Sequence, residues 1–201
     1  MLRQYHIKNY DFKLILLVVA LTVIGIVTIG SANSEFQDNQ IMGLFMGLFV
    51  MVVVSLIDYS FILRFSWVIY GVNLLLLILV ATSLGESTNN SQRWVSIFGI
   101  RFQPSELTKI LLILFFAQFI MLHKERISKL KYIVLSVILL LPPLLLVLKQ
   151  PDLSTTIMIA IVFCVLMFVG GLDKRIVIGI ISVLIPAVII FFILVVQEDQ
   201  T

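Results

Sequence analysis

The stretch LILLVVALTVIGIVTIGS, residues 14–31, carries no charged side chain. As a helix it is long enough to cross the ~30 Å hydrocarbon layer of a bilayer. Hydrophobic residues make up 61% of the 201-residue chain, and charged residues only 12%. Soluble domains are about half apolar and about a quarter charged, so the excess apolar surface must face lipid. The composition therefore predicts an integral membrane protein.

Six further apolar runs of similar length follow the first. Lipid-facing backbone must satisfy its own hydrogen bonds, and the runs are too long for barrel strands, so each is expected to be a helix. The seven runs occupy residues 14–31, 41–57, 66–84, 105–122, 132–148, 153–172 and 176–196. The basic start of the chain resembles a signal peptide, but the long first run and the six that follow favour a retained helix. We therefore expect an all-α, polytopic bundle of seven transmembrane helices without a soluble domain.

Lysine and arginine are distributed unequally between the two sides of this bundle. If the N-terminus is cytoplasmic, ten of the 14 lysines and arginines fall in cytoplasmic segments, and four fall in outer segments or the fourth helix. Cytoplasmic loops are enriched in positive charge, so this count predicts a cytoplasmic N-terminus. Residues 197–201 would then lie outside.

The longest connection, residues 85–104, lies on the predicted outer face and leads into the fourth run through QRWVSIFGIRFQPSELTK, residues 92–109. Pro104 suits a first helical turn. In that turn the helix dipole stabilises the negative charge of Glu106, which can also pair with Lys109 three residues later. A capped helix start with a local ion pair would explain these residues. A charged pair one turn into a span is costly unless it faces the bundle interior or water, which favours a functional role.

Arg93, Trp94 and Arg101 precede this pair. An indole at the headgroup level and arginines at lipid phosphates would explain them. The same side chains would also suit a ligand with phosphates and a sugar or lipid body. The sequence favours neither interpretation.

A second polar cluster, Lys149 to Asp152, lies at the same predicted membrane level. Asp152 stands just before an apolar run, where it suits a helix N-cap, and this structural role alone would explain it. Together with Glu106 and Lys109, however, the cluster would place charged residues at one depth. We therefore expect a shared cavity that opens outward.

Other features of the chain favour packing. Cys164 lies alone in an apolar run and is expected to be a small packing residue. Pro142, Pro143 and Pro186 are expected to kink their helices. The sequence contains no metal-binding motif, phosphate-binding glycine loop or nucleophile triad, and its net charge of +3 gives no indication of a nucleic-acid partner.

Four motifs occur in order along the chain: QRWV at residues 92–95, RFQPSELTK at 101–109, QPDL at 150–153 and FVGGL at 168–172. With them the whole chain resembles the SEDS family (shape, elongation, division and sporulation), typified by RodA and FtsW. Ser154 is a mild departure, since the family often has Gly there. The resemblance implies a bacterial inner-membrane enzyme of ten helices. Such enzymes polymerise glycan strands from lipid II on the outer face, with a class B penicillin-binding protein as partner.

The resemblance also implies a set of residues that line or support the substrate cavity. Glu106 and Lys109 would be the paired charges inside it, and positive charge would stabilise the leaving pyrophosphate. A divalent cation could assist, although no metal ligands are expected within the chain. The expected cavity residues are Arg93, Trp94, Arg101, Glu106, Lys109, Lys149 and Asp152.

The family's catalytic aspartate lies in the large outer loop after the seventh helix, and this sequence stops at Thr201. We therefore expect residues 1–201 to be one SEDS-type transmembrane domain, truncated before that loop and helices eight to ten, with no catalytic residue of its own. Glu106 is the remaining candidate base on the outer side, and its pairing with Lys109 makes it a poor one. Alone, the chain is expected not to polymerise lipid II. A flippase for lipid-linked precursors, or a non-catalytic membrane scaffold or fragment, are the alternatives.

Overall fold

The computed structural model describes residues 11–82, 86–88, 91–97, 100–150 and 152–198. The chain divides into two compact units, Met1–Tyr59 and Ser60–Thr201. Helices dominate both units, and the fold is an all-α polytopic membrane fold, as predicted.

The first unit contains the helices α1 (Phe12–Ala32) and α2 (Gln37–Ser55), joined by a short 3-10 helix, η2 (Ser34–Phe36). Asp11 caps α1, because its carboxylate accepts hydrogen bonds from the N–H groups of Lys13 and Leu14 at 3.1 and 3.2 Å. Neither α1 nor α2 contains a buried residue. The two helices contact each other, and most of their apolar side chains are exposed within this unit.

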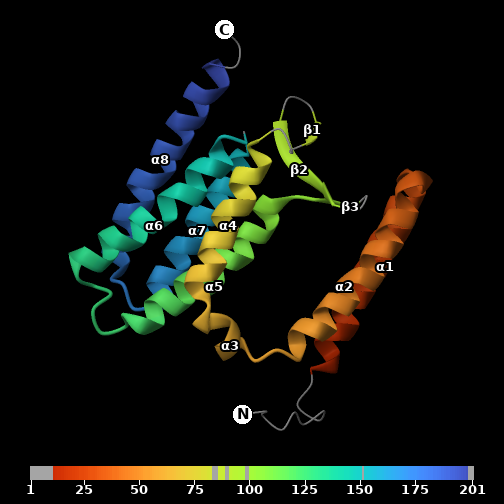
Figure 1. The fold of residues 1–201 in the computed structure, drawn as a ribbon, viewed down its shortest axis with the longest axis horizontal. Helices are drawn as coiled ribbons and strands as arrows, with labels where there is room; N and C mark the ends of the chain where they lie inside the picture. Colours follow the sequence, from red (N-terminus) through yellow and green to blue (C-terminus); the bar gives the residue numbers. More distant parts are fainter. Residues whose placement is uncertain (1–10, 83–85, 89–90, 98–99, 151, 199–201) are drawn as a thin grey trace. The chain divides into compact units, whose positions relative to one another are not determined.

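The second unit is the larger helical bundle, drawn from orange through yellow and green to blue in Figure 1. Within it α5 contacts α4, α6 and α7, and α8 packs on α7. Its helices are α3 (Tyr59–Arg64), α4 (Ser66–Val80), α5 (Pro104–Leu122), α6 (Leu130–Leu148), α7 (Leu153–Val169) and α8 (Lys174–Glu198).

Each of the seven apolar runs corresponds to one helix, namely α1, α2 and α4 to α8. Among the described residues, four helical segments are both long and apolar enough to cross a membrane: Phe12–Ala32, Ser34–Ser55, Pro104–Leu122 and Leu130–Leu148. Two further apolar helices, α4 and α7, are shorter, with 15 and 17 residues. The number of seven spanning helices therefore stays a prediction.

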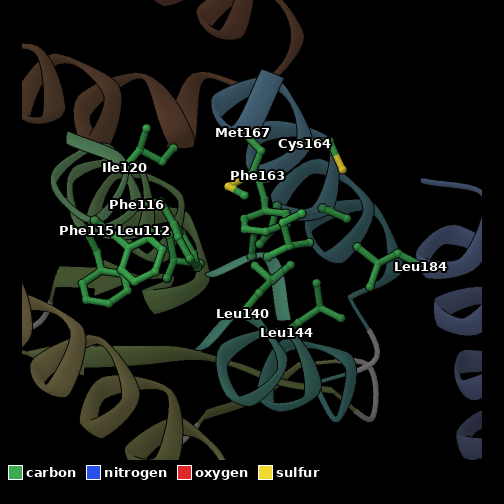
Figure 2. Close-up of a cluster of buried hydrophobic side chains, with 14 of the residues drawn as sticks. Leu112, Phe115, Phe116, Ile120, Leu140, Leu144, Phe163, Cys164, Met167 and Leu184 are labelled. Atoms are coloured by element: carbon green, nitrogen blue, oxygen red, sulfur yellow. The ribbon is translucent and has the colours of Figure 1, made fainter. Parts of the chain in front are cut away.

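The core of the second unit lies where α5, α6 and α7 meet (Figure 2). Phe116 of α5 and Phe163 of α7 stack edge to face, with ring centroids 4.9 Å apart. Leu140 and Leu144 of α6 fill the adjacent space, and both are buried. In lipid such packing contributes through van der Waals contact rather than through exclusion of water. Cys164 is buried in the same cluster, as predicted for a packing residue.

The proline pair of α6 is accommodated by a contact from a neighbouring helix. Pro143 has no N–H to donate to the carbonyl of Leu139 four residues earlier. The hydroxyl of Tyr70 in α4 donates to that carbonyl at 2.8 Å. A hydrogen bond lost within α6 is thus replaced by one between α4 and α6.

The two glycines of the FVGGL motif shape the turn from α7 to α8. Gly171 has φ of +100°, a backbone conformation that other residues rarely adopt. At Gly170 an added Cβ would lie 2.5 Å from the Cγ2 atom of Ile120, so only glycine lets the end of α7 approach α5 this closely. The motif therefore has a structural explanation in this bundle.

The connection predicted as a loop over residues 85–104 contains a small antiparallel sheet, which corrects that expectation. Its strands are β1 (Glu86–Thr88), β2 (Ser91–Ile97) and β3 (Ile100–Phe102), in the order β1-β2-β3. Strand β2 contacts α4 and α5, and its Val95 is buried. Pairing satisfies backbone groups that an irregular segment packed on the helices would leave without partners. The sheet leads directly into α5 (Figure 1).

Candidate functional site

The start of α5 is built by the predicted Pro-Ser-Glu segment. Gln103 takes an extended conformation and serves as N-cap residue, and Pro104 occupies the first helical turn. The N–H of Glu106 donates to the carbonyl of Gln103 at 3.1 Å. The predicted helix start at this segment is confirmed.

Glu106 and Lys109 form the predicted ion pair. The ammonium nitrogen Nζ of Lys109 lies 2.8 Å from Oε2 of Glu106 and 2.9 Å from Oε1. The Lys109 side chain is 26% exposed and that of Glu106 is 58% exposed. Both charges are therefore accessible from outside the packed core, one helical turn from the start of α5.

Asp152 is a buried carboxylate that caps α7, as predicted. It is 4% exposed, and its Oδ1 accepts from the backbone N–H of Thr155 and the hydroxyl of Ser154, both at 3.1 Å. Its Oδ2 accepts from the Thr155 hydroxyl at 2.9 Å and from Nε2 of Gln103 at 3.0 Å. Four donors and the N-terminal end of a helix dipole compensate this buried charge.

Gln103 joins the two predicted polar clusters, and sequence reasoning did not single it out. Its Nε2 donates to Oγ of Ser105 at 2.9 Å as well as to Oδ2 of Asp152. The starts of α5 and α7 are thereby held together, although 49 residues separate the two side chains in sequence. The signal available beforehand was a polar amide directly before Pro104 in an otherwise apolar environment.

A second buried hydrogen bond fixes the rotation of α5 against α4. The hydroxyl of Thr108 lies 2.7 Å from Oδ1 of Asn73, and both residues are almost completely buried. Thr108 stands between Glu106 and Lys109 in sequence, so this bond helps to determine which way the ion pair faces. Among the described residues, Nδ2 of Asn73 has no hydrogen-bond partner. The sequence signal was the single amide within the apolar run of α4.

The remaining predicted residues lie around this centre. Trp94 is on β2 opposite Glu86 and is 37% exposed. Arg101 is opposite Ser96 in the β2–β3 pair, but the side chains of Arg93 and Arg101 lie outside the described part. The choice between headgroup and ligand contacts therefore stays open for these arginines.

Lys149 lies at the end of α6, where it is exposed. Within the described part of the chain it forms no salt bridge with Asp152. The two residues are thus neighbours in the predicted cluster without being a pair. Whether Lys149 contacts a substrate stays a prediction.

The space beside Lys109 is small among the described residues. A cavity of about 10 Å³ is lined by Lys109 and by apolar side chains of α5, α6 and α7, including Leu112, Leu140 and Phe163. This volume suits about one water molecule. The larger outward-facing cavity stays a prediction.

A divalent cation needs several carboxylate or imidazole ligands close together, and the described residues do not provide them. The described residues contain no group of three histidine, cysteine, aspartate or glutamate side chains that could hold a metal ion. The carboxylate of Asp152 already accepts four hydrogen bonds, and that of Glu106 is engaged by Lys109. These side chains therefore do not form a resident metal site by themselves.

Comparison with known proteins gives the chain a family. The model of the cell cycle protein family of FtsW, RodA and SpoVE matches residues 5–200. A probable peptidoglycan glycosyltransferase FtsW of Trichlorobacter lovleyi is 33% identical over 200 residues, covering 93% of this chain and 52% of that protein. The peptidoglycan glycosyltransferase MrdB of Escherichia coli strain K12 is 33% identical over 186 residues, covering 90% of this chain and 49% of that protein.

Solved structures agree with this assignment. The crystal structure of the rod shape determining protein RodA of Thermus thermophilus has a TM-score of 0.76 and 29% identity, covering 87% of this chain and 58% of that chain. A structure described as the coordination of polymerization and crosslinking by a peptidoglycan synthase complex also has a TM-score of 0.76, with 30% identity over 89% of this chain and 54% of that one. The chain spans about half the length of the curated relatives it matches.

Proposed function

Because the chain belongs to the SEDS family, which includes FtsW, RodA and SpoVE, we propose that residues 1–201 form the substrate-binding part of a peptidoglycan glycosyltransferase that acts on lipid II. The protein is a multi-pass membrane protein. The bacterial inner membrane, with the start of α5 facing outward, is part of the proposal.

The observation that carries this proposal is the ion pair at the start of α5. A charged pair in a membrane bundle is retained only at a cost, so it favours a functional role. Lys109 presents a partly exposed ammonium group whose charge is balanced by Glu106. A pyrophosphate could replace or share that balance, because its oxygens are strong acceptors for a lysine ammonium.

The proposed reaction needs both positive charge and a base. The 4-hydroxyl of one sugar attacks the anomeric carbon of another, the bond from that carbon to the lipid pyrophosphate breaks, and the hydroxyl proton passes to a base. Lys109 would stabilise the negative charge that grows on the leaving pyrophosphate. Glu106 would orient Lys109, and the Gln103–Asp152 bond would hold the starts of α5 and α7 in place.

Among the proposed cavity residues, neither described carboxylate is a free base for this reaction. Asp152 is saturated by four hydrogen-bond donors, and both oxygens of Glu106 contact Lys109. We therefore propose that the polypeptide of residues 1–201 binds lipid II without polymerising it. The aspartate that the family uses as its catalytic group would supply the missing base.

Two partners complete the proposal. One relative of similar fold belongs to a peptidoglycan synthase complex, which supports a class B penicillin-binding protein as the partner of this chain. A divalent cation could accompany the pyrophosphate of the substrate, since the described residues offer no metal site of their own. Lipid II binding measured with Mg²⁺ and with a chelator would test the cation.

A binding experiment tests the proposed function. The chain is reconstituted in nanodiscs, and its affinity for fluorescent lipid II is compared between the wild type, Lys109→Met and Lys174→Met. We expect Lys109→Met to weaken binding at least about tenfold, because one charge-assisted contact to phosphate is lost. Lys174→Met removes an equal charge at the start of α8 and should leave the affinity unchanged. Equal affinities for all three proteins would contradict the proposal.

An activity experiment separates the alternatives. The purified chain is mixed with its class B penicillin-binding protein, which does not itself polymerise glycan strands. Both proteins are then given lipid II in vesicles. We expect neither glycan polymer nor movement of lipid II between leaflets. Robust polymer would overturn the predicted inactivity of residues 1–201, and rapid movement without polymer would favour the flippase.

A further inference from the structure

The turn between α5 and α6 carries an unbalanced cluster of cations. Its residues 123–131 contain four lysines or arginines and one glutamate, a formal net charge of +3 that equals that of the whole chain. Within the described part of the chain, none of these five side chains forms a salt bridge. The charged residues are Lys124, Glu125, Arg126, Lys129 and Lys131, and all are exposed.

Backbone hydrogen bonds and one buried side chain give this turn a defined conformation. Successive backbone bonds run from the N–H of Arg126 to the carbonyl of His123 at 2.8 Å, and from the N–H of Lys129 to the carbonyl of Arg126 at 2.9 Å. Ile127 is 2% exposed and belongs to the hydrophobic core. One buried side chain thus anchors the segment, and the charged side chains on either side of it point away from the core.

His123 adds an oriented ring to the same turn. The ring lies between Phe119 of α5 and Tyr132 of α6, with centroids 4.6 and 4.7 Å away. Its Nδ1 lies 2.8 Å from the carbonyl oxygen of Phe119, so Nδ1 carries a proton and donates it. Among the described residues, no hydrogen bond engages the remaining nitrogen, Nε2.

The start of this turn and the last residues of α5 line a polar pocket that is open to the surface. It has a volume of about 550 Å³ and is lined by Met121, Leu122, His123, Lys124, Glu125 and Arg126. Met121 and Leu122, the last residues of α5, are 64% and 66% exposed. The cavity therefore has an apolar side, which continues from a membrane helix, and a cationic side.

We propose that this cavity binds the phosphate headgroup of an anionic phospholipid. The cations would hold the phosphate, and the exposed ends of Met121 and Leu122 would contact the acyl region. Clusters of four or more lysines and arginines next to a membrane helix attract anionic lipids, by about 1 kcal/mol for each cation near the surface. A soluble anion would gain nothing from the apolar side, whereas the acyl region of a phospholipid would contact it.

This site is separate from the proposed substrate site. Helix α5 has 19 residues, a rise of about 28 Å, so its two ends lie roughly one hydrocarbon thickness apart. The sheet and the turn lie at opposite ends of α5 in Figure 1. The predicted topology places the turn on the cytoplasmic side, where most lysines and arginines of the chain fall. A Lys109 variant that binds lipid II as tightly as the wild type would contradict the proposed function, but it would not contradict phospholipid binding at the α5–α6 turn.

The test is a measurement of lipid selectivity. The full chain is reconstituted in phosphatidylcholine bilayers that contain a trace of spin-labelled phosphatidylglycerol or spin-labelled phosphatidylcholine. The immobilised fraction of each label gives the preference for the anionic lipid. We expect the wild type to prefer phosphatidylglycerol, and Lys124→Gln with Arg126→Gln to lower that preference at least about threefold.

Two matched variants serve as controls. Lys174→Gln with Arg175→Gln removes the same charge from the α7–α8 turn, also predicted to be cytoplasmic, and should change the preference much less. Lys124→Arg with Arg126→Lys keeps the charge and should keep the preference. Circular dichroism should report equal helicity for all variants, because the changed side chains are exposed.

Three results would overturn the proposal. Equal losses in the two charge-removing variants would mean that only general surface charge attracts the lipid. A wild type without preference would mean that the turn serves another partner, such as an acidic protein. Displacement of the labelled lipid by equimolar inorganic phosphate or soluble glycerophosphoglycerol would mean that the site takes a free anion.

Discussion

The two ends of α5 differ in how their polar side chains are satisfied. At its start, buried polar atoms are paired across helices: Gln103 bonds Asp152, and Thr108 bonds Asn73. At its end, the cations of the α5–α6 turn are exposed and form no salt bridge within the described residues. Burial explains the difference, since an unpaired buried polar atom is costly and an exposed charge is solvated.

This difference separates residues that hold geometry from residues that are free to bind. The Glu106–Lys109 pair belongs to neither extreme, because it is paired but partly exposed. Two buried interhelical bonds, made by Gln103 and Thr108, fix the helix that carries it. We therefore expect changes to the buried bonds to cost stability, and changes to the ion pair to cost binding.

The largest expected effect on stability comes from Asp152→Ala. It removes the N-cap of α7, leaves the buried N–H of Thr155 without its acceptor and takes away one of the two acceptors of the Gln103 amide. We expect the free energy of unfolding to fall by about 2–4 kcal/mol. Unfolding in mixed micelles, followed by circular dichroism, measures it. Asp152→Asn keeps an oxygen at the N-cap and should lose clearly less, and equal losses would show that the cap does not matter.

Thr108→Val should have the next largest effect. It removes the hydroxyl without changing side-chain shape and leaves the oxygen of Asn73 buried and unpaired. We expect a loss of about 1–2 kcal/mol. Adding Asn73→Leu should recover most of that loss, because the polar group without a partner is then gone. A double variant as unstable as Thr108→Val alone would contradict the importance of this pair.

Tyr70→Phe should cost less, about 1 kcal/mol. It removes the donor to the Leu139 carbonyl, which Pro143 leaves open within α6. The informative control is Pro143→Ala, which restores a donor to that carbonyl inside α6. In the Pro143→Ala background, Tyr70→Phe should be nearly neutral, whereas an undiminished cost would mean that the hydroxyl acts elsewhere.

Glu106→Gln should have the smallest effect on stability, within about 0.5 kcal/mol, because partly exposed ion pairs contribute little. Its effect should appear in lipid II affinity, since Lys109 loses the group that orients it. Parallel unfolding and binding measurements on this variant check both statements. A large loss of stability with unchanged affinity would make the pair structural.

Much of the fold could be predicted because apolarity is a local property. Seven apolar runs predicted seven helices, and the start of α5 was recognised from Pro104 and Glu106. The short sheet and α3 were not predicted, because their few residues have no run of their own. Strand β2 is stabilised by contacts with α4 and α5, and the sequence of a strand does not reveal such partners.

The candidate site was predictable only in part, for the same reason. Glu106 with Lys109, and Asp152 with Thr155, interact at spacings of three residues, which a sequence displays directly. Gln103 and Asn73 have partners 49 and 35 residues away. Single amides in apolar runs indicate that a partner exists, but the packing of the helices decides which one it is.

Site-specific photo-crosslinking tests the central claim, that lipid II reaches the start of α5, most directly. Trp94 on β2 is replaced by p-benzoylphenylalanine, and in a matched variant Trp67 of α4, also exposed, is replaced instead. Each chain is irradiated with labelled lipid II in nanodiscs. We predict a lipid II adduct at position 94 and little at position 67. Equal adducts at both positions, or an adduct at 67 alone, would contradict the account.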